Sequence, residues 1–244
     1  GLIVGNRCHA QMERYAVVIN EIMADPSPVI GLPNAEYIEL RNNSSSTINL
    51  YKWRIDNGTT TASVAVNYWL APDSLVILCS KSQAVFFNAP SKTLGLTSFP
   101  ALTNEGDLIT LTAPDGKTIH SVSYDINSYG NPVQSSGGWS LEMMDPRIPC
   151  NMLNWRASTN SKGGTPGAEN SIYKKFSVDN NLQALQCTAI NEKLLLLTLN
   201  QGADSSSLAI ASHYQLAGWS NAIKAASALP PLFNSIEIFL NQSL

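Results

Sequence analysis

The chain has 244 residues and 44% of them are hydrophobic, enough to bury the core of one large or two ordinary domains without oligomerisation. Only 14% are charged and the net charge is −3, so no domain-scale basic face is expected, and the bulk charge gives no support to nucleic-acid binding. No apolar run, residues 194–197 included, approaches the roughly 20 residues that a membrane-spanning helix requires.

The first predicted element is a strand over residues 16–24. It ends before Pro26 and Pro28, because proline cannot continue a hydrogen-bonded ladder. A second strand is predicted over 36–42, where Tyr37 and neighbouring apolar residues alternate with polar ones in the period of a half-buried strand. The two strands with the Pro-rich turn between them predict an antiparallel pair at the start of the fold.

Short apolar runs separated by turn signals continue along the chain. Further strands are predicted near residues 47–55, 75–79, 107–113, 118–124 and 139–143, and one helical turn near 82–88. The Asp115-Gly116 dipeptide tolerates the positive φ of a tight turn, so residues 107–124 are predicted to form a hairpin. Short strands at this spacing predict an all-β sandwich.

A second β pattern follows a loop rich in Ser, Gly and Pro at residues 158–167. Strands are predicted near residues 182–190, 193–199, 207–216, 223–227 and 235–240. This is fewer than the about seven strands of an immunoglobulin-type domain. The predicted division is a leader or the end of a preceding module at 1–15, a β-sandwich at 16–170, and a smaller or incomplete Ig-like β-domain at 171–244, either a small variant or one cut short.

Carboxylates gather at the first predicted strand pair: Glu21, Asp25, Glu36 and Glu39. One interpretation is a solvated strand face with a turn in which Asp25 bonds its own backbone. Period-2 geometry puts Glu21 on the same face as Met23, which predicts a partly buried, hydrogen-bonded carboxyl. The alternatives are a general acid/base pair or a Ca²⁺ site, since calcium takes several oxygen ligands from loops. The candidate metal ligands are Glu21, Asp25 and Asp107, and no other cofactor is expected.

Aromatic residues supply the other binding candidates. Trp53, Trp139 and Trp155 are predicted to pack in the core, where tryptophan commonly anchors a sandwich. Tyr68 and Trp69 precede a turn and, if both are exposed, could stack on a sugar ring or on a side chain of a partner. Tyr124 and Tyr129 are predicted to form a second polar-aromatic patch with the loop 127–134. The candidate ligand-binding residues are therefore Tyr68, Trp69, Tyr124 and Tyr129.

No catalytic motif accompanies these candidates. The sequence has no H-E-x-x-H, G-x-S-x-G, P-loop or dinucleotide-binding pattern, and its three histidines, His9, His120 and His213, are scattered. The four cysteines are Cys8, Cys79, Cys150 and Cys187, and none forms a C-x-x-C pair. Either buried thiols or a structural disulfide fits this spacing, whereas a catalytic thiol lacks a partner histidine.

Several segments in a fixed order resemble a bacterial lamin-tail domain across residues 16–170. They are Val18–Pro26, Glu36–Leu40, Leu50–Ile55, Asn104–Ile109 and Gly138–Glu142. The closing segments, Asn154–Ser158 and Gly163–Gly167, are similar to the ends of versions found in exported proteins of the Bacteroidetes. The tail after residue 179 resembles a bacterial Ig-like module.

The resemblance implies an immunoglobulin-like β-sandwich and a non-catalytic interaction or scaffold module of an exported or cell-envelope protein. Such a module is expected to bind a protein or envelope ligand through loops or a sheet edge, and neither an enzymatic activity nor nucleic-acid binding is expected. The alternative is a carbohydrate- or calcium-dependent binding module that accompanies a secreted hydrolase. Similarity of fold alone does not decide between them.

Overall fold

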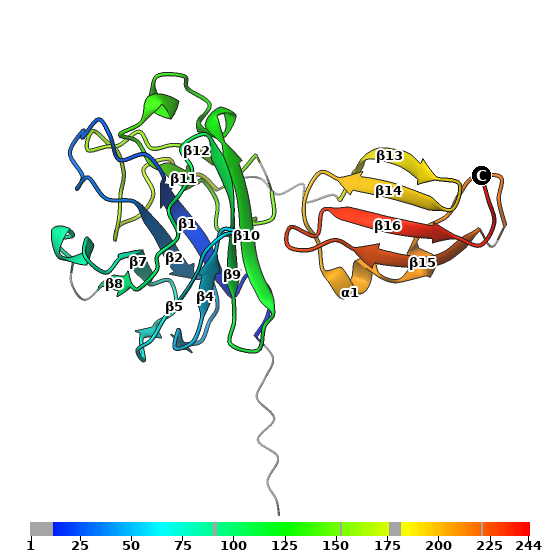
Figure 1. Ribbon diagram of the computed structural model, residues 1–244, viewed down its shortest axis with the longest axis horizontal. Coiled ribbons are helices and arrows are strands. Elements are labelled where there is room, and N and C mark those ends of the chain that lie inside the picture. The colour runs from blue at the N-terminus through cyan, green and yellow to red at the C-terminus, as the bar shows by residue number, and fades with distance from the viewer. Residues whose placement is uncertain (1–11, 90–91, 152, 176–181, 221) are drawn as a thin grey trace, which may run out of the picture.

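The computed structural model describes residues 12–89, 92–151, 153–175, 182–220 and 222–244 (Figure 1). The fold is all-β, as predicted. One six-stranded sheet has the order β12 (Trp155–Ala157), β11 (Leu141–Met143), β1 (Val17–Met23), β2 (Tyr37–Asn42), β7 (Leu75–Ser80) and β8 (Thr93–Leu96). A four-stranded sheet has the order β10 (Thr118–Asp125), β9 (Gly106–Thr112), β4 (Arg54–Asp56) and β5 (Thr61–Ser63).

These two sheets enclose the main core. Trp53 and Trp155 are buried in it, as predicted, with aliphatic side chains from both sheets such as Ile22 and Leu111. The predicted hairpin is confirmed as β9 and β10, which pair antiparallel. His120 on β10 joins the two sheets, because its Nδ1 accepts a hydrogen bond from the backbone N–H of Ile19 at 2.9 Å. Burial lowers the pKa of His120 to about 4, so the ring is neutral and structural near pH 7.

The predicted strand over 47–55 is divided in two. Its first part, β3 (Ile48–Asn49), pairs with β6 (Trp69–Leu70), and its second part is β4. Between them the backbone turns at Lys52, which has a positive φ of 65°, and the N–H of Trp53 donates to the carbonyl of Leu50. Four short strands were not predicted: β5, β6, β8 and β12. Strands of this length show no periodic pattern in the sequence.

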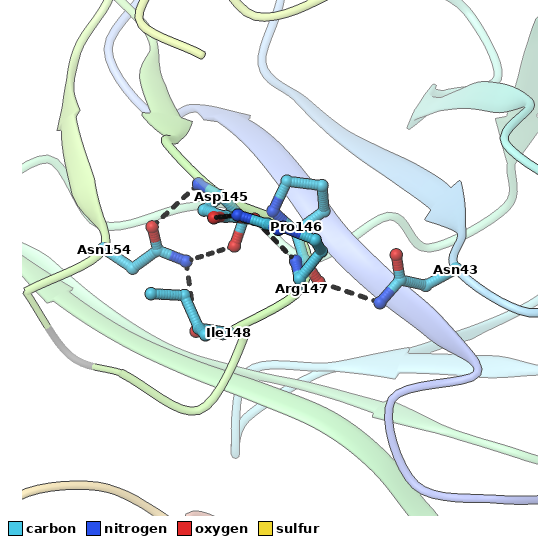
Figure 2. Close-up of polar contacts among 6 residues, drawn as sticks. All are labelled: Asn43, Asp145, Pro146, Arg147, Ile148 and Asn154. Carbon is cyan, nitrogen blue, oxygen red and sulfur yellow. Dashed lines mark hydrogen bonds and ion pairs between the residues drawn. The ribbon is translucent and has the colours of Figure 1, made fainter. Parts of the chain in front are cut away.

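The short 3-10 helices described on the loops of these sheets include η1 (Ala84–Phe86), η3 (Ile126–Tyr129) and η4 (Gln134–Ser136). The first agrees with the helical turn predicted near residues 82–88. The loop after β11 is braced by side chains that Figure 2 shows pointing toward one another. Asp145, which is fully buried, receives two hydrogen bonds from the Arg147 guanidinium, and the Asn154 amide donates to the carbonyls of Asp145 and Ile148.

A third sheet follows residue 181, in the order β13 (Ala184–Asn191), β14 (Leu194–Leu199), β16 (Ser235–Leu240) and β15 (Ile223–Ala228). The prediction of a strand over 207–216 is wrong, because this segment contains α1 (Ser205–Leu208) and η5 (Ala211–His213). The cause is an N-cap: the Asp204 carboxylate accepts a hydrogen bond from the N–H of Ser207 and so starts a helical turn.

Contacts from the first two sheets reach this third one. The guanidinium of Arg14 donates to the carbonyls of Ala203 and Leu232 at 2.7 and 2.9 Å and lies 4.5 Å from the centre of the Phe233 ring. Asn151, in the braced loop, forms an isolated β-bridge with Gln201. The junction is therefore a set of specific polar contacts, and a boundary near residue 170 remains a prediction.

Candidate functional site

Three glutamates lie side by side across the six-stranded sheet. In the strand register, Glu21 on β1 is opposite Glu39 on β2 on one side and opposite Glu142 on β11 on the other. All three side chains are completely buried. A row of acidic side chains inside a protein is costly unless every oxygen is hydrogen-bonded, so the donors around this carboxylate row (Glu21, Glu39 and Glu142) decide its role.

Most of the donors come from one covering segment, residues 158–172, which passes over the outer face of the sheet. Its backbone N–H groups donate directly to the row: Thr165 to Glu21, Gly167 to Glu39 and Ile172 to Glu142. The hydroxyls of Thr165 and Ser171 add bonds of 2.9 Å to Glu142. The carboxylate row thus fastens a segment without secondary structure to the sheet.

Glu21 has the most partners in the row. Oε1 of Glu21 accepts from the hydroxyls of Tyr37 and Ser140, each at 2.6 Å, and from the N–H of Thr165 at 2.8 Å. The prediction that Glu21 is buried and hydrogen-bonded is confirmed. The solvated strand face that was predicted for Glu21 and Glu39 is wrong, because the covering segment lies on the face where these side chains point.

The buried position changes the proton affinity of Glu21 and Glu39. Burial, and then the charge of Glu142, raise the pKa of Glu21 to about 7. Burial, and then the charge of Glu21, raise the pKa of Glu39 to about 8. Carboxyls with these pKa values could exchange protons near neutral pH, but they are enclosed by protein donors and no substrate atom can approach them. Their arrangement serves structure.

We expect the stability of the fold to fall between pH 6.5 and 8. The pKa values of Glu21 and Glu39 are higher in the folded state, about 7 and about 8, than the ordinary 4.5, so the folded state retains protons that the unfolded chain has released. Their stabilising contribution is complete below pH 4.5 and is lost as the pH rises through the folded pKa values. His120 acts in the opposite direction, but only between its folded pKa of about 4 and its ordinary 6.5.

The measurement is the free energy of unfolding in urea at half-unit steps from pH 6.5 to 8. The control variant is Glu39→Gln, which removes one titrating group and is expected to make the decline shallower whatever it does to the absolute stability. An equal slope in the variant and the parent would contradict the assignment of the titration to Glu39.

The other two candidate metal ligands, Asp25 and Asp107, are not part of the carboxylate row. Asp25 accepts a hydrogen bond from the N–H of Ser27, which is the predicted turn in which it bonds its own backbone. Asp107 accepts from the side chain of Asn57 and from the N–H of Leu108. Within the described ranges, no group of three or more His, Cys, Asp or Glu side chains is placed to hold a metal ion. A calcium site at Glu21, Asp25 and Asp107 stays a prediction.

The two tyrosines of the second aromatic candidate are core residues. Tyr124 and Tyr129 are buried, and the hydroxyl of Tyr124 donates to the carbonyl of Thr103 at 2.9 Å. Burial, and then the charge of Asp25, raise the pKa of Tyr129 to about 12. Their rings pack inside the sandwich, so the geometry does not support the expected stacking of a ligand on them.

Tyr68 and Trp69 point in opposite directions, as neighbours on a strand do. Tyr68 is half-buried and packs against the main core, whereas 68% of the Trp69 side chain is exposed. Asn49, paired with Trp69 in the ladder, holds this edge in place: Oδ1 of Asn49 accepts from the N–H groups of Tyr51 and Tyr68, and its amide donates to Oδ1 of Asn67 at 2.8 Å. We call Asn49, Tyr51, Asn67 and Trp69 the Trp69 face.

A groove beside the covering segment has a volume of about 670 Å³. It is lined by Leu32, Phe86, Phe87 and Pro166 among others, and Lys162 is the one ionisable residue of its described lining.

Within the part of the chain that the structure describes, the cysteines and histidines form no reactive constellation. Cys79, Cys150 and Cys187 are free, and Cys8 lies outside the described residues, so a disulfide that involves Cys8 stays a prediction. His9 also lies outside them, and His213 is bonded to the Ser207 carbonyl on the surface of the third sheet. Sequence reasoning missed Glu142 and the donors of the covering segment. Only the alternation of Leu141 and Glu142 in a predicted strand hinted that Glu142 faces away from the main core.

Comparison with known proteins gives one family. Residues 10–125 match the family model of the Lamin Tail Domain, a match that includes β1 to β10. This family is an immunoglobulin-like, non-enzymatic interaction domain. No curated protein matches the chain. Among the described residues no helix is long and apolar enough to cross a membrane.

Proposed function

We propose that this chain is a non-catalytic interaction module of an exported or cell-envelope protein, and that the Trp69 face binds its partner. The match to the lamin tail domain supports an interaction role, and the same match includes β3 and β6, which carry the face. The proposal adds the location of the contact surface and the nature of the partner, a protein of the cell envelope.

The exposure of Trp69 carries the proposal. All five tryptophans of the chain lie in described segments: Trp53 and Trp155 are buried, Trp139 and Trp219 are half-buried, and 68% of Trp69 faces solvent. Tryptophan contributes more often than most residues to the binding energy of protein interfaces. The ring also stands on a rigid support, because Asn49 fixes both backbone segments beneath it.

One observation favours a second candidate, a carbohydrate-binding module beside a secreted hydrolase. The Trp69 ring lies next to the amide pair of Asn49 and Asn67. An apolar ring face and side-chain amides are the groups that a sugar needs, since its CH face packs on the ring and its hydroxyls bond to amides. No comparable observation supports the calcium dependence that was predicted for this candidate. The experiment on carbohydrate binding therefore tests calcium dependence as well.

The experiment is cosedimentation of the purified chain with an insoluble envelope preparation from a Gram-negative bacterium. One portion of the preparation is treated with protease and another with lysozyme. We expect the chain to bind, and to lose binding after protease treatment. Loss after lysozyme treatment only would favour the carbohydrate candidate, and EDTA in parallel samples tests the calcium dependence.

Replacing Trp69 with alanine is expected to weaken this binding at least about tenfold, because truncation of a central aromatic anchor typically costs 2 kcal/mol or more. The matched control is Phe86→Ala, since Phe86 is also an exposed aromatic but lies on η1, away from β6. Equal binding of Trp69→Ala and the parent, or no binding by either, would overturn the proposal.

A further inference from the structure

The edge strand β13 of the third sheet is unprotected. All 8 of its residues are exposed, and within the described chain it pairs with β14 alone (Figure 1). Its other backbone edge and both of its side-chain faces are open to solvent. An edge strand with free N–H and C=O groups is a template for another strand, and proteins normally shield such edges.

The other long edges of this molecule are shielded. On the far side of the same sheet, β15 carries Lys224 and contacts α1 and η5. In the second sheet, the equally long edge strand β10 is mostly buried, and the N–H of Tyr15 bonds to its Ile119 carbonyl. Among the described edge strands of six or more residues, β13 is therefore the open one.

The chemistry of β13 favours pairing rather than solvation. No residue from Leu182 to Asn191 is charged, and there is no proline. Leu185 and Ile190 expose 65% and 54% of their surface, and Cys187 between them is also exposed. Charged residues and proline are the usual means of keeping an edge strand unpaired, and both are missing from this one.

We propose that β13 pairs antiparallel with β13 of a second copy of this chain, around a two-fold axis at Cys187. Such pairing is self-complementary, because a two-fold interface brings the same patch together from both copies. An uncharged strand meets its own copy without like-charge repulsion, which is the reason to assign the edge to a second copy. In this dimer, the third sheet of one copy continues into the third sheet of the other copy across the two-fold axis.

The position of the axis follows from the ladder. Hydrogen-bonded and non-hydrogen-bonded pairs alternate along antiparallel strands, so a two-fold axis must relate one residue to itself and cannot fall between two residues. The bulges between Ala184 and Gln186 and between Ala189 and Asn191 restrict regular pairing to the middle of the strand. With the axis at Cys187, Leu185 lies opposite Ala189 and Gln186 opposite Thr188, so a large side chain meets a small one.

The test is sedimentation velocity under reducing conditions over a range from micromolar to millimolar chain concentration. A single strand pair buries less than the roughly 800 Å² per partner of a standard interface, so we expect a concentration-dependent dimer rather than a permanent one. Because position 187 is exposed, substitutions there leave the fold intact. Cys187→Ser is expected to dimerise like the parent.

The deciding variants place charge on the axis. Cys187→Lys and Cys187→Glu each put like charges opposite one another and are expected to weaken the dimer at least about tenfold, whereas an equal mixture of the two restores it. A parent that stays monomeric at millimolar concentration, a dimer unaffected by Cys187→Lys, or a mixture no better than either variant alone would overturn the proposal. The Trp69 face is a separate surface, so either proposal can fail without the other.

Discussion

Replacing Glu21 with alanine is expected to lower the free energy of unfolding by about 3–5 kcal/mol. The change removes the acceptor shared by the Tyr37 hydroxyl, the Ser140 hydroxyl and the Thr165 N–H. These donors remain buried, and each unsatisfied buried donor costs roughly 1–3 kcal/mol. The total loss of stability is smaller than the sum of these costs, because release of the covering segment lets water reach the donors.

Urea unfolding followed by tryptophan fluorescence measures this loss, and amide hydrogen exchange at Thr165 and Gly167 locates it. We expect the two amides to lose protection first, because they donate to the carboxylate row. The control is Glu105→Ala, which removes an exposed carboxylate and is expected to change stability by no more than about 0.5 kcal/mol. A Glu21→Ala loss as small as that of the control would mean that the row does not hold the segment.

The carboxylate row shows what the sequence could and could not predict. Alternation along residues 16–24 placed Glu21 beside Met23 and so predicted its burial. Nothing in that pattern indicates that Glu142, more than a hundred residues later, lies opposite it in the sheet. Register between distant strands depends on packing of the whole sandwich, and a period read from one strand contains no information about its partner.

The exposure of the aromatic candidates could not be predicted for a similar reason. Exposure of Trp69 and burial of Tyr124 and Tyr129 depend on which face of each strand meets the second sheet. Alternation along one strand shows that neighbouring residues point to opposite faces, but it does not show which face meets the second sheet. The sequence therefore predicted the all-β class and the longer strands, while the accessible surface became clear only from the assembled sheets.

Residues 163–167, Gly-Gly-Thr-Pro-Gly, contribute to the resemblance to a lamin-tail domain, and they also have a physical role in this fold. A Cβ on Gly164 would lie 2.7 Å from Oε1 of Glu21, so glycine is needed for the segment to approach the carboxylate row. Thr165 and Gly167 supply the N–H donors to Glu21 and Glu39. Lys92 donates to the Gly167 carbonyl at 2.7 Å and so fixes the next peptide group of the segment. The motif is the contact surface between the covering segment and the sheet.

Gly163 begins this motif, and Gly163→Ala is expected to destabilise the fold by about 4 kcal/mol or more. Its φ is +92°, and a Cβ there would lie 2.2 Å from the carbonyl oxygen of Gly138. The backbone at residue 163 cannot easily move away to relieve this clash, because the N–H of Ser140 donates to the Gly163 carbonyl at 2.7 Å. Gly138 is itself confined, since a Cβ at Gly138 would lie 2.3 Å from the Pro28 carbonyl oxygen.

Gly116→Ala separates the two causes of this loss. Gly116 has a nearly equal φ of +89°, but a Cβ at Gly116 would meet nothing within 4 Å. This variant therefore measures the cost of the left-handed backbone alone, about 1–2 kcal/mol. The thermal and urea stabilities of both variants are to be compared with the parent. The excess of Gly163→Ala over Gly116→Ala is the cost of separating the covering segment from the loop at Gly138. Equal losses would mean that the close approach of these backbones contributes nothing to holding the segment on the sheet.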